Sequence, residues 1–149
     1  MIALLDCNNF YVSCERLFNT KLENKAIVVL SNNDGCIISR SEEAKNMGIR
    51  MGEPFFKIEQ KLRKLGVHIY SSNYPLYADI SKRVMSIIQK SCPTLEEYSI
   101  DEAFFDLTFI QNKEIEKFCS ELRSKILKWT GIPVSIGIGR TKTLAKIAN

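Results

Sequence analysis

Apolar residues along this chain follow two patterns, short continuous or alternating runs and longer stretches with helical spacing. The runs are rich in β-branched and aromatic side chains and predict strands. They lie at residues 1–6, 25–30, 36–39, 67–70, 95–99, 103–107 and 133–138. The helical repeats, several of which are bounded by Pro, Asn or Gly, predict helices. These lie at residues 10–18, 41–47, 54–65, 75–91, 112–130 and 141–149, with Trp129 on a buried helix face.

The order of these elements predicts two parts of different character. Without residues 18–72 the chain reads strand, helix, strand, strand, helix, strand, which is the ferredoxin-like βαββαβ order. Residues 18–72 then form a small α/β lobe that is inserted after the first strand. The predicted fold class is therefore α+β, and the chain shows no internal repeat or low-complexity linker.

The composition indicates a globular protein and excludes several classes, but it does not identify a reaction. The chain has 149 residues, of which 45% are hydrophobic, enough for a buried core. The net charge of +4 is a weak indication of a polyanionic partner. Five scattered cysteines without a C-x-x-C pair, and one histidine, argue against a zinc site or a disulfide framework. The first apolar run is too short for a signal peptide, and no run has membrane-spanning length, so we expect a cytoplasmic protein without a membrane partner.

Two adjacent acids, Asp101 and Glu102, lie between apolar runs where a β-hairpin is predicted to turn. Asp6 ends the first strand, an inner neighbour of that hairpin in a ferredoxin-like sheet, so we expect Asp6 to face Asp101. Both hairpin acids point inward only if a turn or bulge separates them. Three converging carboxylates suit two Mg²⁺ ions and in-line displacement at phosphorus. The plainer alternative is an exposed polar turn, and the residues alone leave both interpretations open.

Four motifs, in this order along the chain, resemble those of the Y-family translesion DNA polymerases. The resemblance is to the N-terminal part of these enzymes and extends over essentially all 149 residues. The second motif favours the UmuC branch. The motifs are Leu5-Asp6-Cys7-Asn8-Asn9-Phe10-Tyr11, Ser31-Asn32-Asn33-Asp34-Gly35-Cys36, Tyr98-Ser99-Ile100-Asp101-Glu102-Ala103 and Gly139-Arg140-Thr141-Lys142-Thr143-Leu144-Ala145-Lys146.

The resemblance implies a domain division and a set of metal ligands. It implies a catalytic palm at residues 1–17 and 73–149, with a fingers domain at residues 18–72. The catalytic carboxylates implied are those of Asp6, Asp101 and Glu102, and the backbone carbonyl of Cys7 is a further metal ligand. The implied cofactor is a pair of Mg²⁺ ions, for which Mn²⁺ substitutes.

The resemblance also implies contacts with the incoming nucleotide. Tyr11 matches the steric gate, the ring that stacks under the sugar and blocks a 2′-hydroxyl. The backbone N–H groups of Phe10 and Tyr11 are expected to hold phosphate. In the fingers the family usually offers a tyrosine and an arginine to the triphosphate, and the aligned residues here are Glu42 and Lys45. Lys45 can still contact phosphate as a point charge, whereas Glu42 repels it.

The implied activity is template-directed addition of deoxynucleotides opposite damaged bases, in DNA damage tolerance and the SOS response. Its implied partners are primer-template DNA and dNTP, and for the full-length parent a UmuD-type subunit, RecA and the sliding clamp. The sequence stops inside a predicted helix, so we expect a fragment that does not polymerise alone. Two alternatives are a nucleotide-cyclase-like palm enzyme and a catalytically inactive interaction module.

Overall fold

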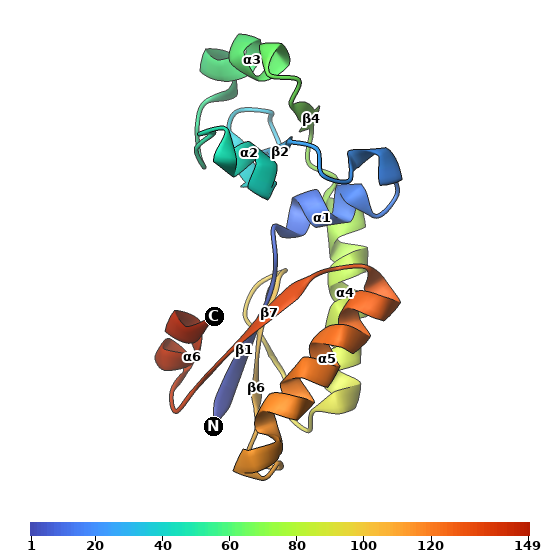
Figure 1. Ribbon diagram of the computed structural model, residues 1–149, viewed down its shortest axis with the longest axis vertical. Coiled ribbons are helices and arrows are strands. Elements are labelled where there is room, and N and C mark those ends of the chain that lie inside the picture. Colours follow the sequence, from blue (N-terminus) through green and yellow to red (C-terminus); the bar gives the residue numbers. More distant parts are fainter. The chain divides into compact units, whose positions relative to one another are not determined.

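The protein is described by a computed structural model of residues 1–149, which divide into two compact units. The first unit joins Met1–Asn8 to Leu76–Asn149, and the second comprises Asn9–Pro75. Figure 1 shows the elements of both. No helix is both long enough and apolar enough to cross a membrane.

The first unit is built on a four-stranded antiparallel sheet with the strand order β5-β6-β1-β7. Its strands are β1 (Ile2–Cys7), β5 (Glu96–Glu97), β6 (Glu102–Asp106) and β7 (Val134–Gly139). Its helices are α4 (Tyr74–Ser91), α5 (Ile115–Thr130) and α6 (Lys142–Ala148). The first two residues of α4 are grouped with the second unit, which ends at Pro75, and a 3-10 turn at Asn112–Glu114 precedes α5. This is the order and strand arrangement of a ferredoxin-like sheet, so the predicted α+β fold class is confirmed.

Helices cover both faces of this sheet, with α4 and α5 on one side and α6 on the other (Figure 1). On the α6 side, Leu4 and Phe104 pack against Ala145. Helix α6 approaches β7 so closely that a Cβ atom at Gly137 would lie 2.2 Å from the Ala145 carbonyl oxygen. Because strand β1 is covered on both faces, its apolar residues form an unbroken run instead of an alternating one.

The second unit has a three-stranded sheet with the order β3-β2-β4. Strand β2 (Ile27–Leu30) pairs antiparallel with β3 (Ile37–Arg40) and parallel with β4 (His68–Tyr70). Its helices are α1 (Phe10–Arg16), a 3-10 turn at Thr20–Leu22, α2 (Glu42–Asn46) and α3 (Phe55–Lys64). The Ser41 side chain caps α2 by accepting a hydrogen bond from the Ala44 N–H group.

Two details of the predicted elements are wrong. The strand expected at residues 95–99 is reduced to Glu96–Glu97. Trp129, which was expected in the core, is 63% exposed. The buried stripe of α5 runs through Ile115, Cys119, Leu122 and Ile126, and Trp129 lies in the last turn before Gly131 ends the helix. Helical spacing predicts which face of a helix is apolar, but it does not reveal where the surface that covers this face ends.

Candidate active site

The register of β1 and β6 brings three acidic residues to one end of the first unit's sheet. Asp6 lies directly opposite Glu102. The next residue, Cys7, donates its N–H to the Asp101 carbonyl oxygen over 2.9 Å. The expected convergence is thus present in the backbone, although Glu102 and not Asp101 is the direct partner of Asp6. The reason is that β6 begins at Glu102, while Asp101 belongs to the preceding turn.

Ser99 organises the two hairpin acids. Its hydroxyl lies 2.8 Å from Asp101 Oδ1 and 3.3 Å from Glu102 Oε2. Its N–H donates to the Glu102 carbonyl oxygen and closes the turn. The sequence analysis missed this residue. The available signal was a serine two positions before an acid, since Ser side chains commonly bond to groups two or three residues away.

The three carboxylates are incompletely neutralised. Burial, together with the negative charges of Asp101 and Glu102, raises the pKa of Asp6 to about 6, while the charge of Lys146 acts in the opposite direction. A buried carboxylate beside like charges is stabilised by a bound cation. The electrostatics therefore favour a positively charged ligand at this end of the sheet.

Lys146 supplies part of that positive charge. Its ammonium lies 2.8 Å from Glu102 Oε1 and 4.8 Å from the centre of the Tyr98 ring. As the side chains lie, no three acidic, histidine or cysteine side chains form a ready set of metal ligands. The chemistry of the donors still fits Mg²⁺ or Mn²⁺, which bind carboxylate and carbonyl oxygens. Metal binding would require Glu102 to exchange the Lys146 ammonium for the ion.

The pKa of Asp6 gives a test by pH. Because its pKa rises from 3.8 to about 6 on folding, the stability tied to its protonated form is lost as the pH rises through this range. Asp6→Asn is therefore expected to raise the free energy of unfolding by about 1 kcal/mol near pH 8 and to change little near pH 4. Urea unfolding across this range measures the difference. Equal effects at pH 4 and pH 8 would contradict the raised pKa of Asp6.

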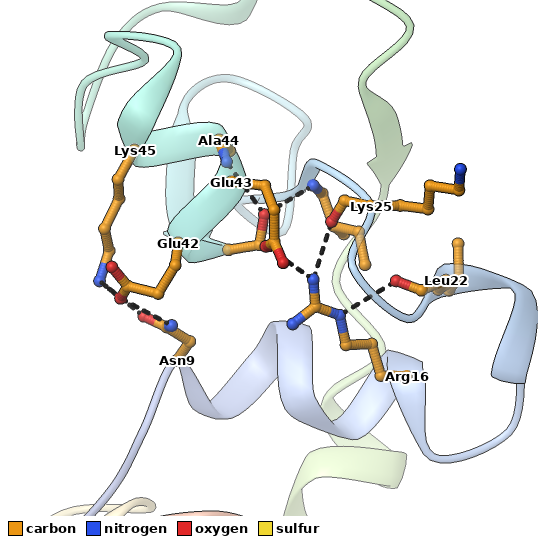
Figure 2. A network of polar contacts seen from close by, with 10 residues as sticks. Asn9, Arg16, Leu22, Lys25, Glu42, Glu43, Ala44 and Lys45 are labelled. Atoms are coloured by element: carbon orange, nitrogen blue, oxygen red, sulfur yellow. Dashed lines mark hydrogen bonds and ion pairs between the residues drawn. The ribbon is translucent and has the colours of Figure 1, made fainter.

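The expected nucleotide contacts Phe10, Tyr11 and Lys45 all lie in the second unit. Phe10 and Tyr11 begin α1, with ring centres 5.8 Å apart, and Tyr11 meets Tyr74 edge-on at 6.1 Å. Phe10 is buried, while the Tyr11 side chain is half-buried. Lys45 is engaged by Glu42, as Figure 2 shows.

The basic side chains of Lys142 and Arg40 also have partners within the chain. Lys142 pairs with Glu96 at 2.6 Å. Arg40 donates to the Ile49 carbonyl oxygen at 2.8 Å, while its Nε is buried without a hydrogen-bond partner. His68 is exposed at the start of β4, as expected for a surface residue.

Curated relatives match the chain over its whole length. Protein UmuC of Salmonella typhimurium is 52% identical over 150 residues, which are 100% of this chain and 36% of the relative. DNA polymerase IV 1 of Halalkalibacterium halodurans is 31% identical over 153 residues, covering 100% of this chain and 37% of the relative. The chain therefore spans about a third of the length of the curated relatives that it matches.

Solved structures and a family model agree with these relatives. A Dbh ternary complex with partially disordered substrates has a TM-score of 0.89 at 27% identity, covering 99% of this chain and 44% of the other. DinB from Sulfolobus solfataricus has a TM-score of 0.85 at 28% identity, with the same coverage. The resemblance to Y-family polymerases is confirmed. The model of the impB/mucB/samB (IMS) family matches residues 5–149, and the chain therefore belongs to this family.

Proposed function

We propose that this chain is the catalytic part of an error-prone translesion DNA polymerase that transfers deoxynucleotides to a primer under the direction of a template. The observation that carries the proposal is the β1–β6 register, which pairs Asp6 with Glu102 and ties Asp101 to Cys7. It occurs in a chain that is 52% identical to a protein named UmuC. The presence of all three carboxylates argues against a catalytically inactive module.

The proposed chemistry uses these residues together. Asp6, Asp101, Glu102 and the Cys7 carbonyl would hold two Mg²⁺ ions, with Mn²⁺ as a substitute, which supply charge neutralisation for in-line displacement at phosphorus. The Ser99 hydroxyl helps to orient the two hairpin carboxylates, since its single O–H group can donate a hydrogen bond shared between Asp101 and Glu102. Glu102 is paired with Lys146, and it would exchange this partner for the ion when it binds metal.

The second unit would bind the nucleotide. The N–H groups of Phe10 and Tyr11 would hold phosphate, Lys45 would add a positive charge, and the Tyr11 ring would exclude a 2′-hydroxyl. We propose the palm at residues 1–17 and 73–149 and the fingers at residues 18–72. The compact units divide at Asn8 and Pro75 instead, so α1 is grouped with the inserted lobe.

Primer-template DNA and dNTP are the proposed substrates. For the full-length protein we propose a UmuD-type subunit, RecA and the sliding clamp as partners, in the SOS response to DNA damage. The 42% identity to two proteins named MucB and the 49% identity to one named ImpB support assignment to the UmuC-like branch.

Primer extension by the full-length protein tests the proposal. With Mg²⁺ and its partners supplied, we expect insertion of the complementary nucleotide on undamaged templates and extension past an abasic site. Removal of divalent ions with a chelator should abolish both activities. Nucleotide joining that ignores the template sequence would contradict a polymerase and favour a cyclase-like enzyme.

A further inference from the structure

Asn9, Glu42 and Lys45 form a closed polar triangle within the second unit (Figure 2). The Lys45 ammonium donates to Glu42 Oε1 at 2.7 Å and to Asn9 Oδ1 at 2.8 Å. The Asn9 amide donates to the same Glu42 oxygen at 3.2 Å. Hydrogen bonds from Lys45 and then from Asn9, together with the charge of Lys45, lower the pKa of Glu42. The carboxylate is therefore charged at neutral pH.

The Asn9 side chain does not cap helix α1. Asn9 is the N-cap residue of α1, but its side chain makes no capping hydrogen bond, and its φ of 46° lies in the left-handed region. A capping asparagine usually has an extended backbone, from which its side chain accepts a hydrogen bond from the first turn of the helix. The Asn9 side chain instead reaches α2 and fixes the end of Lys45. The side-chain contacts of Asn9 are therefore with Lys45 and Glu42 of α2 and not with the first turn of α1.

The neighbouring acid Glu43 has a different, structural contact and serves as a comparison for Glu42. It pairs with Arg16 at 2.9 Å, and Arg16 also donates to the carbonyl oxygens of Leu22 and Lys25. Figure 2 shows these contacts beside the triangle. The Arg16 pair thus fastens α1 and α2 to the chain before β2. By contrast, the Glu42 side chain is 68% exposed and holds only the ends of Lys45 and Asn9.

We propose that the Glu42 carboxylate competes with a triphosphate for the Lys45 ammonium, which Asn9 also holds, and that a bound triphosphate displaces this carboxylate. This inference rests on the proposed nucleotide-binding role of Lys45. Because exposed ion pairs contribute little free energy, replacing Glu42 by a phosphate at the Lys45 ammonium has a small energetic cost. A triphosphate carries several negative charges against one on Glu42 and competes effectively for the ammonium. Glu42 also repels the bound phosphate and thereby weakens nucleotide binding.

Titration of the chain with inorganic tripolyphosphate, without metal, tests this inference. Glu42→Gln keeps an oxygen that accepts from Lys45 but removes the charge, so affinity should rise about threefold to tenfold. Lys45→Gln should lower affinity, and Glu43→Gln, the matched control on the same helix, should leave it unchanged. In the wild type the Asn9 side-chain amide resonances should shift on titration. An unchanged or weaker affinity of Glu42→Gln, or an equal gain with Glu43→Gln, would overturn the inference.

Kinetics of the full-length protein separate competition for Lys45 from an effect on general stability. Glu42→Gln should lower KM for the nucleotide and leave kcat unchanged, since it alters binding and not the reacting atoms. Tripolyphosphate binding needs neither template nor primer. If the variants bind tripolyphosphate as expected but the full-length protein extends no primer, the polymerase proposal is contradicted and the role of Glu42 is not. Primer extension with no gain in tripolyphosphate affinity for Glu42→Gln would contradict the role of Glu42 alone.

Discussion

Asp101→Asn in the full-length protein is expected to lower the single-turnover rate of nucleotide addition about a thousandfold. Two-metal catalysis derives several kcal/mol of transition-state stabilisation from the ions, and each 1.4 kcal/mol corresponds to about a factor of ten in rate. The substitution removes one charged ligand but retains an oxygen that can accept from the Ser99 hydroxyl. Folding should be intact, so rapid-quench measurement of primer extension reports on the chemistry.

Asp106→Asn is the matched control for this loss. Asp106 is the last residue of β6, at the end of the strand away from Asp101 and opposite Ile2, and its carboxylate accepts hydrogen bonds from the Thr108 N–H and hydroxyl groups. Its substitution should leave the rate within about twofold of the wild type, since it lies away from the acidic cluster. Similar losses in both variants would show that negative charge in this part of the chain, and not metal binding by Asp101, controls activity.

Gly137→Ala is expected to destabilise the first unit severely. The added Cβ would lie 2.2 Å from the Ala145 carbonyl oxygen and 2.3 Å from the Asn149 amide nitrogen, both of which are backbone atoms. Helix α6 must therefore move away from β7, with an expected loss of about 3 kcal/mol. For a domain of this size we expect a drop in Tm of about 10 °C, measured by circular dichroism.

Gly66→Ala is the control that introduces backbone strain without a steric clash. Gly66 has a φ of 70°, but a Cβ there would have no neighbour within 4 Å. Its substitution should cost only the left-handed strain of about 1 kcal/mol. If both variants lost the same stability, the close packing of α6 on β7 would not be the cause. Movement of α6 would also carry Lys146 away from Glu102 and so connect this packing to the candidate site.

The framework of the fold was accessible from the sequence because the chain marks its elements clearly. Helix α5 lies between Asn112 and Gly131, and β2 is a run of aliphatic residues followed by a dense turn signal. The convergence of Asp6 with the hairpin acids followed from ferredoxin-like topology alone. These features depend on local propensity and strand order, which short sequence patterns record well.

Several details of the site depend on register and side-chain contacts that no pattern records. Whether Asp6 pairs with Asp101 or Glu102 is set by where the hairpin turn ends, a difference of one residue. The contact of Lys146 with Glu102 spans 44 positions of the chain. The exposure of Trp129 depends on the extent of the surface packed against α5. Tertiary packing determines each of these features.

Counting the divalent ions bound by this chain tests the central claim most directly. Electron paramagnetic resonance with Mn²⁺, in the presence of a non-hydrolysable nucleotide, should detect two ions on the wild type and on Asp106→Asn. A variant with Asp6→Asn, Asp101→Asn and Glu102→Gln together should bind none. Equal Mn²⁺ binding by the wild type and the triple variant would show that these carboxylates do not form the metal site.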